Sequence, residues 1–217
     1  MNGTVQKHLA TLVANHPELS VCVPDIERAF SLMESGFRRG GKLLIAGNGG
    51  SAADADHIAG ELMKSFVLPR PVDTLAEKMR EIDPVRGAAL AEKLQAGLPT
   101  VALTQHAALT TAYLNDVAES APYVFAQQLS VLGKAGDVFL AISTSGSSEN
   151  ILNAAVVAEA LEIPVIALTG ERGGKLAEVA DVAIRVPATE TYRVQEYHLP
   201  VYHALCLMIE EAFFEQP

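Results

Sequence analysis

The sequence is poor in cysteine, with only Cys22 and Cys206 among its 217 residues. Both lie in apolar stretches with helical spacing, so a disulfide framework is not expected and a reducing compartment is the simpler interpretation. Residues 1–8 also lack the basic segment and apolar run of a secretory signal. These two absences together predict a cytoplasmic protein.

Basic residues and long apolar runs are scarce as well. Lysine and arginine number 16 against 26 aspartates and glutamates, a net charge of −10, which argues against a nucleic-acid partner. No apolar run approaches the roughly 20 residues needed to cross a bilayer, so no membrane partner is expected. With 49% hydrophobic and 19% charged residues, the composition is globular, and the length suits a single domain over residues 1–217.

Two short segments rich in serine and glycine each follow a predicted strand. The first is Gly-Asn-Gly-Gly-Ser at residues 47–51, and the second is Ser-Thr-Ser-Gly-Ser-Ser at residues 143–148. Small residues let backbone N–H groups approach a ligand, hydroxyls add donors, and the N-terminus of a following helix favours an anion. Neither segment is a Walker A loop or a full dinucleotide fingerprint. One such turn often binds nothing, but two in one chain favour a sugar phosphate.

Short apolar segments rich in β-branched residues alternate with helical patterns along the chain. The predicted strands are residues 42–46, 100–103, 138–142, 165–168 and 182–186. Apolar strands that alternate with helices indicate a parallel sheet covered on both faces, here a three-layer α/β/α sandwich. Two helices are expected within residues 1–40, and a closing helix over residues 191–214 contains Pro200, which predicts a kink or a break.

Residues 67–98 differ in character from the rest, because three prolines punctuate a charged stretch. Apolar residues within it are spaced for two consecutive helices. The pattern predicts a helical hairpin inserted between strands. It could be a solvated surface excursion or a lid over the site, and both interpretations remain open.

Two sets of polar side chains could carry chemistry. His57 and Glu61 are four residues apart on the helix after the first glycine turn, so they share one face near the presumed phosphate. Gln195 and His203 are eight residues apart on the closing helix, again on one face. An imidazole and a carboxylate beside a phosphate turn favour proton transfer or metal binding, although a simple ion pair is the alternative.

Four motifs in the chain resemble those of the phosphoheptose isomerases, within the sugar isomerase (SIS) superfamily. They lie at residues 47–57, 142–148, 167–175 and 192–196 with His203, and the resemblance covers nearly all of the chain outside residues 67–98. It implies a single SIS domain with a five-stranded parallel sheet, assembled as a homotetramer with active sites between subunits. It also implies interconversion of sedoheptulose 7-phosphate and D-glycero-D-manno-heptose 7-phosphate.

The resemblance also implies roles for individual residues. Glu61 resembles the general base, and His203 resembles the acid that serves the oxygen during ring opening and enediol formation. The implied substrate-binding residues, including the phosphate-binding hydroxyls, are Asn48, Gly49, Gly50, Ser51, Ser143, Thr144, Ser145, Ser148 and Gln195.

Several family members bind zinc with the residues that correspond to His57, Glu61, Gln195 and His203, so zinc is the implied cofactor. These side chains offer the nitrogen and oxygen donors that Zn²⁺ accepts. A carboxylate held by Zn²⁺ is a poor base, because the cation stabilises its ionised form. The catalytic and ligand roles of Glu61 therefore compete, and the sequence does not choose between them.

Three positions depart from the family pattern and concern recognition of the sugar hydroxyls. His106 and Tyr192 stand where members carry acidic residues, and Ser65 stands where some carry arginine. Two alternatives follow: an isomerase of another sugar phosphate, or a non-catalytic phosphosugar-binding or partner-binding protein resembling the DnaA initiator-associating protein. A binder has no use for a base and an acid, so retention of His57 and the other zinc-type residues favours the enzyme.

Overall fold

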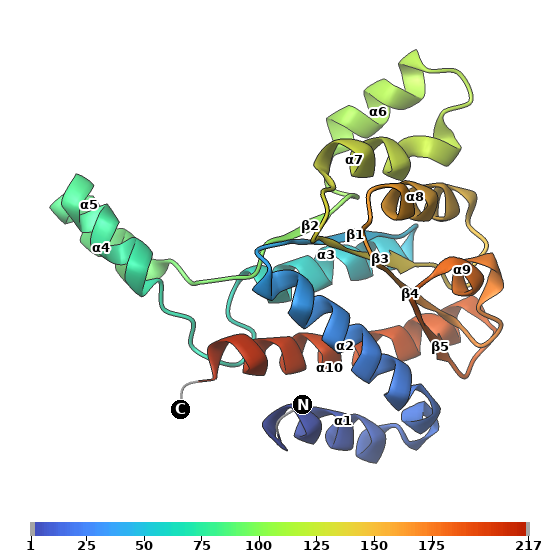
Figure 1. Cartoon of the computed structure of the whole chain (residues 1–217), viewed down its shortest axis with the longest axis horizontal. Coiled ribbons are helices and arrows are strands. Elements are labelled where there is room, and N and C mark those ends of the chain that lie inside the picture. Colours follow the sequence, from blue (N-terminus) through green and yellow to red (C-terminus); the bar gives the residue numbers. More distant parts are fainter. Residues whose placement is uncertain (1–2, 216–217) are drawn as a thin grey trace.

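A computed structural model describes residues 3–215, apart from the side chains of residues 3, 4 and 74. Within these residues the strands form one parallel five-stranded sheet in the order β2-β1-β3-β4-β5 (Figure 1). The strands are β1 (Leu43–Ala46), β2 (Thr100–Ala102), β3 (Val138–Ile142), β4 (Val165–Gly170) and β5 (Val182–Val186). The predicted α/β fold is confirmed.

Helices connect the strands and cover the sheet. They are α1 (Gly3–Asn15), α2 (Val23–Arg38), α3 (Gly50–Met63), α4 (Asp73–Ile82), α5 (Pro84–Lys93), α6 (Ala107–Asp116), α7 (Val124–Leu132), α8 (Glu149–Ala160), α9 (Gly174–Val179) and α10 (Thr191–Phe214), with 3₁₀ turns η1 (Pro17–Cys22) and η2 (Ala121–Tyr123). None of those in the described part of the chain is both long and apolar enough to span a bilayer.

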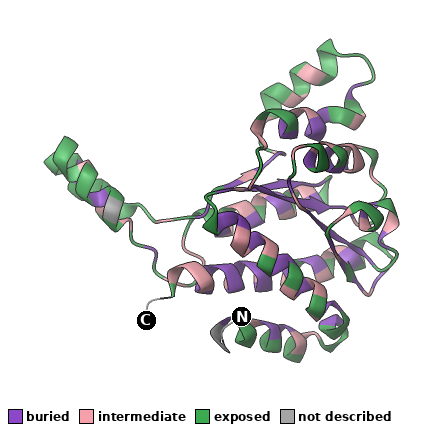
Figure 2. Cartoon of the chain, in the orientation of Figure 1, coloured by how far each residue is buried: buried purple, intermediate pink, exposed green. Residues whose placement is uncertain are grey.

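The side chains of β1 alternate between two hydrophobic cores, one on each face of the sheet. Leu43 and Ile45 pack with α1, α2, α3 and α10, whereas Leu44 and Ala46 pack with α7, α8 and α9. Figure 2 shows this buried central layer between half-buried helices. Because β1 pairs with β2 on one side and β3 on the other, the topology switches at β1, and the turns after β1 and β3 meet there. This is where open α/β sheets bind ligands.

The closing helix α10 continues across Pro200 as a single helix, so the predicted break does not occur. Proline removes one backbone donor from the helix. Val201, Tyr202 and Leu205, which follow it, are almost fully buried, and this packing outweighs the lost hydrogen bond.

The helical hairpin of α4 and α5 stands out from the body of the molecule (Figure 1). Its two helices pack mainly against each other, and the side chain of Asp83 caps α5 by accepting hydrogen bonds from the N–H groups of Val85 and Arg86. Ile82 and Val85 at its tip are 85% and 81% exposed. The roles of the hairpin as a lid or as a surface excursion stay predictions.

His198 is a fully buried histidine on α10 that faces the sheet. Neither of its ring nitrogens has a side-chain hydrogen-bond partner of good geometry among the described residues. Burial lowers its pKa to about 4, and the backbone of Thr169 has a smaller opposing effect. The folded protein therefore holds this ring neutral at pH values where the unfolded chain protonates it.

We expect His198 to make the folded state sensitive to mild acid. Below pH 6.5 the unfolded chain gains a proton that the folded chain does not bind until about pH 4, so the free energy of unfolding falls by about 3 kcal/mol across this interval. His198→Leu should remove that loss, because leucine carries no titrating group. Urea unfolding of both proteins at several pH values measures it, and parallel curves would contradict the assignment.

Candidate active site

The turn between β1 and α3 forms the first serine–glycine segment. Gly49 precedes α3 with φ of +56°, a left-handed conformation that glycine adopts without strain. Ser51 is buried in the first turn of α3. The side-chain amides of Asn48 and Asn150 exchange two hydrogen bonds of 2.9 and 2.8 Å, which tie this turn to α8.

The turn between β3 and α8 forms the second segment. Gly146 has φ of +63°, and a Cβ there would collide with the carbonyl oxygen of Gly173, so only glycine fits. The hydroxyls of Ser143 and Ser148 are 3.0 Å apart. The turn borders a cavity of about 320 Å³ lined by Thr144, Ser145, Ser147, Gly170, Glu171, Arg172, Gly174, Ala188 and Thr189. A cavity edged by hydroxyls at a helix N-terminus is suited to a phosphate group.

Helices α3 and α10 lie side by side and run in the same direction. The amide of Gln195 lies directly against Gly50, where a Cβ would collide with it. Further along, Tyr202 bonds to His57, and Glu210 accepts hydrogen bonds beyond the end of α3. The seam between these helices therefore places the predicted polar residues of one helix beside those of the other.

Each carboxylate oxygen of Glu61 contacts a basic side chain. Its Oε1 is 3.2 Å from Nε2 of His57, and its Oε2 accepts a hydrogen bond of 2.9 Å from Lys64. Burial acts to raise the pKa of Glu61, but the hydrogen bond and charge of Lys64, together with His57, outweigh it and hold that pKa below its usual value. Glu61 is thus ionised and able to accept a proton at neutral pH.

His203 packs edge-on against His57, with ring centroids 5.0 Å apart. Its Nε2 is buried and has no hydrogen-bond partner within residues 3–215. Burial, and then the nearby His57, lower the pKa of His203, with Glu61 opposing them. An unpartnered buried nitrogen is unusual in a folded protein, which makes this point of the seam a candidate functional site.

The structure brings Glu61, His57 and His203 together but separates them from the phosphate turns. Ser51 and Glu61 are ten residues apart on α3, about 15 Å along the helix axis. The cavity beside Ser145 includes neither Glu61 nor His203 in its lining. Within one chain, Glu61 therefore lies about three helical turns from the first serine–glycine turn along the α3–α10 seam.

The predicted zinc ligands fit the ion in donor type but are not assembled around it. His57 and His203 offer nitrogens, and Glu61 and Gln195 offer oxygens, a set that Zn²⁺ accepts. Nε2 of His203 has no hydrogen-bond partner among the described residues, so its lone pair is available to a metal ion. Even so, the described residues contain no group of three or more His, Cys, Asp or Glu arranged to hold a metal ion.

Comparison with known proteins identifies the family. A family model described as the SIS domain matches residues 76–170. A phosphoheptose isomerase from Rhodospirillum rubrum is 40% identical over 194 residues, covering 89% of each chain. Another from Aneurinibacillus thermoaerophilus is 40% identical over 178 residues, covering 82% of this chain and 76% of the relative. The chain belongs to the phosphoheptose isomerase family.

Solved structures of the family agree with this assignment. Phosphoheptose isomerases from Francisella tularensis and Neisseria gonorrhoeae align with TM-scores of 0.74 and 0.69 at 32% and 35% identity. They cover 95% and 93% of this chain, and 96% and 95% of their own. This phosphoheptose isomerase family member is accordingly a phosphosugar isomerase, so the predicted enzyme class is confirmed over the non-catalytic alternative.

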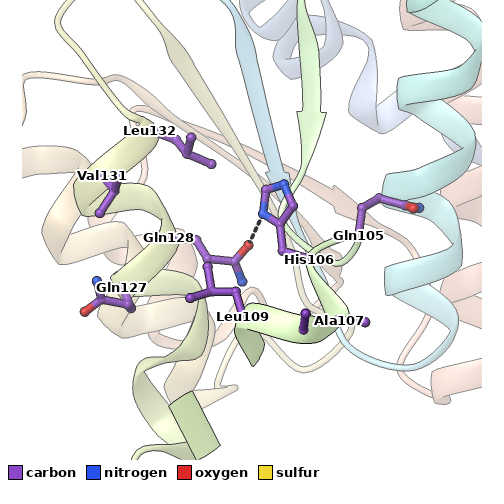
Figure 3. Close-up of a pocket in the computed structure, with 9 residues that line it drawn as sticks. Gln105, His106, Ala107, Leu109, Gln127, Gln128, Val131 and Leu132 are labelled. Atoms are coloured by element: carbon purple, nitrogen blue, oxygen red, sulfur yellow. Dashed lines mark hydrogen bonds between the residues drawn. The ribbon is translucent and has the colours of Figure 1, made fainter. Parts of the chain in front are cut away.

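The three positions that depart from the phosphoheptose isomerase pattern lie in different surroundings. Nδ1 of His106 is 2.7 Å from Oε1 of Gln128, at a cavity of about 620 Å³ between the β2–α6 segment and α7 (Figure 3). The hydroxyl of Ser65 is buried without a hydrogen-bond partner in the described part of the chain. Tyr192 is 63% exposed. Only Ser65, four residues after Glu61, is close to the acid–base group along the chain.

Sequence reasoning missed two residues that contact the candidate site of this phosphoheptose isomerase family member, Asp54 and Tyr202. Tyr202 is 2% exposed, and its hydroxyl donates a 3.3 Å hydrogen bond to Asp54 while it lies 3.0 Å from Nδ1 of His57. Asp54 stands three residues before His57, and Tyr202 directly precedes His203. The helical spacing of Asp54 was a usable signal, but a tyrosine in an apolar helix face gives none.

Proposed function

We propose that this enzyme interconverts sedoheptulose 7-phosphate and D-glycero-D-manno-heptose 7-phosphate through an enediol. The observation that supports this most directly is the group of Glu61, His57 and His203, with Glu61 3.2 Å from His57 and the two imidazole rings 5.0 Å apart. An aldose–ketose isomerisation needs one group to move a proton between adjacent carbons and another to serve the oxygens. This group contains both.

In the proposed reaction Glu61 removes the proton from C1 of the ketose. The C1–H electrons form the C1–C2 double bond, and the C2 carbonyl oxygen accepts a proton from His203, which yields the enediol. Glu61 then returns its proton to C2 while the C1 hydroxyl gives its proton to His203, so no atom is gained or lost. Because the pKa of His203 is lowered, its ring is neutral at neutral pH. It would therefore donate from a neutral ring N–H, and the proton taken from the C1 hydroxyl would restore that N–H.

The serine turns hold the phosphate in this proposal. Ser51, Ser143, Thr144, Ser145 and Ser148 supply hydroxyls, the N-termini of α3 and α8 favour the anion, and Asn48 and Gln195 contact the sugar. Because about 15 Å of helix separates Ser51 from Glu61, we propose that a homotetramer completes each site by bringing the phosphate turns of one subunit towards the acid–base group of another.

We retain zinc as the proposed cofactor, held by His57, Glu61, Gln195 and His203. Zn²⁺ bound there would polarise the sugar carbonyl oxygen as a Lewis acid. The chain's own residues orient the substrate and move the protons. Since no ligand group is assembled in the described residues, small side-chain movements along the α3–α10 seam would have to accompany binding.

A second candidate is isomerisation of a different sugar phosphate by the same residues. His106 and Ser65 favour it, because they replace the acid and the arginine that the family pattern places near the sugar. A shorter ketose phosphate or an amino sugar phosphate would leave the Glu61 chemistry unchanged.

An assay with a panel of sugar phosphates tests the proposal, and Ser143→Ala tests the phosphate site. We expect turnover of sedoheptulose 7-phosphate and, for Ser143→Ala, a KM raised about 10- to 100-fold, as expected for loss of a hydrogen bond to a charged group. Ser31→Ala, on the exposed face of α2, is the matched control and should behave as wild type. Faster turnover of another sugar phosphate would replace the proposed substrate, and an unchanged KM would remove Ser143 from the site.

A further inference from the structure

Four side chains form a continuous line from the interior of the α3–α10 seam to the candidate base. The hydroxyl of Tyr202 donates to Oδ1 of Asp54 at 3.3 Å and lies 3.0 Å from Nδ1 of His57. On the other side of the imidazole ring, Nε2 is 3.2 Å from Oε1 of Glu61. Tyr202 is 2% exposed, so its hydroxyl contacts are shielded from water, whereas the His57 side chain is 42% exposed.

The number of available protons fixes the direction of these hydrogen bonds. A tyrosine hydroxyl has one proton, and an ionised carboxylate only accepts. Since the single proton of Tyr202 points to Asp54, the tyrosine oxygen can only accept from His57. Nδ1 of His57 must then carry a proton, and whenever the ring is neutral its Nε2 presents a lone pair.

With this direction, the neutral His57 ring presents a hydrogen-bond acceptor to Glu61. The Nε2 lone pair and the Glu61 carboxylate oxygen are both acceptors, yet they face each other at 3.2 Å. Two acceptors at that separation repel unless a positive charge lies between or beside them, which a proton or a divalent cation supplies. The opposite direction, with Nε2–H donating to Glu61, would make the contact an ordinary hydrogen bond to a carboxylate one helical turn away.

We propose that Asp54 and Tyr202 are positioning residues that hold His57 in the tautomer with its proton on Nδ1 and its Nε2 lone pair turned towards Glu61. They contact neither substrate nor reacting atoms, and act through His57. The inference deepens the proposed function, because it assigns how the acid–base group is kept ready to share a cation. It does not depend on which sugar phosphate is the substrate.

The direct test is the tautomer of His57 in the metal-free protein. Long-range proton–nitrogen correlation spectra of the ¹⁵N-histidine-labelled enzyme at pH 8.5 distinguish a protonated Nδ1 from a protonated Nε2, and His57→Gln assigns the signal. We expect the Nδ1–H form. An Nε2–H form, or a ring protonated on both nitrogens, would overturn the proposal whether or not the enzyme is active.

Two variants test the contribution of each positioning residue. Tyr202→Phe removes the acceptor, so the proton should redistribute towards Nε2. Asp54→Leu removes the acceptor of the tyrosine proton, so Tyr202 becomes free to donate to Nδ1 and the ring should switch to the Nε2–H form. Tyr197→Phe is the matched control, because Tyr197 lies on the same helix and its hydroxyl donates to Glu18 at 2.9 Å instead of contacting His57. An Nδ1–H form retained in both site variants would refute the positioning role.

Kinetics and zinc affinity give a second readout. Loss of a partner that orients an imidazole typically costs 10- to 100-fold in metal affinity or activity. We expect Tyr202→Phe to lower kcat by that factor with KM within about twofold, and to weaken Zn²⁺ binding in competition with a chromogenic chelator. The double variant Tyr202→Phe with Asp54→Leu should lose little more than either single variant, because the residues act as one unit. Additive losses would contradict this, and an inactive wild type would reject the proposed function alone.

Discussion

Glu61→Gln is expected to lower kcat for the isomerisation by about 100- to 10,000-fold, the usual contribution of a positioned acid or base. Glutamine has the same shape but cannot accept the C1 proton. Lys64 and His57 both contact the Glu61 carboxylate, so the amide can keep one of these contacts and the fold should survive. Because Glu61 is not placed at the phosphate turns, KM should change much less than kcat.

Steady-state assays of the wild type and Glu61→Gln measure this effect, with thermal unfolding to verify the fold. Glu34→Gln is the matched control, since Glu34 also pairs with a cation, Arg38 at 2.7 Å, but on the surface of α2. That variant should retain wild-type kcat. A fully active Glu61→Gln enzyme would remove Glu61 as the base while leaving the membership in the isomerase family untouched.

Glu210→Gln is expected to lower the free energy of unfolding by about 3–5 kcal/mol, the cost of leaving a buried charge without its partner. Glu210 and Arg70 are almost fully buried and 2.8 Å apart. Glu210 also accepts hydrogen bonds from the N–H groups of Phe66 and Val67 at 2.9 Å. An amide removes the charge that offsets Arg70 and turns one acceptor into a donor facing these N–H groups.

The location of this ion pair also links stability to the active site. Arg70 donates to the carbonyl oxygens of Leu62 at 2.8 Å and Glu61 at 3.2 Å, so the pair holds the end of α3 and the base of the hairpin. We therefore expect Glu210→Gln to reduce activity as well as stability.

Urea unfolding at a fixed protein concentration measures the loss in Glu210→Gln, because association shifts apparent stability. Glu34→Gln again serves as the control, since an exposed i,i+4 pair contributes only about 0.3–0.5 kcal/mol. Equal stabilities of the two variants would show that the buried pair is no more important than a surface one.

Most of the fold could be predicted from local patterns. β3 and β5 have the predicted ends, and α10 spans the predicted residues 191–214. The alternation of short apolar strands with helices is enough for this, because parallel strands must be covered on both faces. The end of α3 at Met63 follows from no local pattern, since Glu210 of α10 accepts hydrogen bonds from the N–H groups of Phe66 and Val67 that would otherwise continue the helix.

In the candidate site, too, local sequence patterns reveal some features, and only the packing of the fold determines the others. Glycine turns and i,i+4 spacing are local features, so Gly49, Gly146, His57 and Glu61 could be recognised in the linear chain. The pairing of His57 with Tyr202 over 145 residues, the buried contact of Arg70 with Glu210 over 140 residues, and the length of seam between Ser51 and Glu61 could not. Which side chains meet across two helices depends on the register in which α3 and α10 pack, and packing of a whole core, not any short pattern, sets that register.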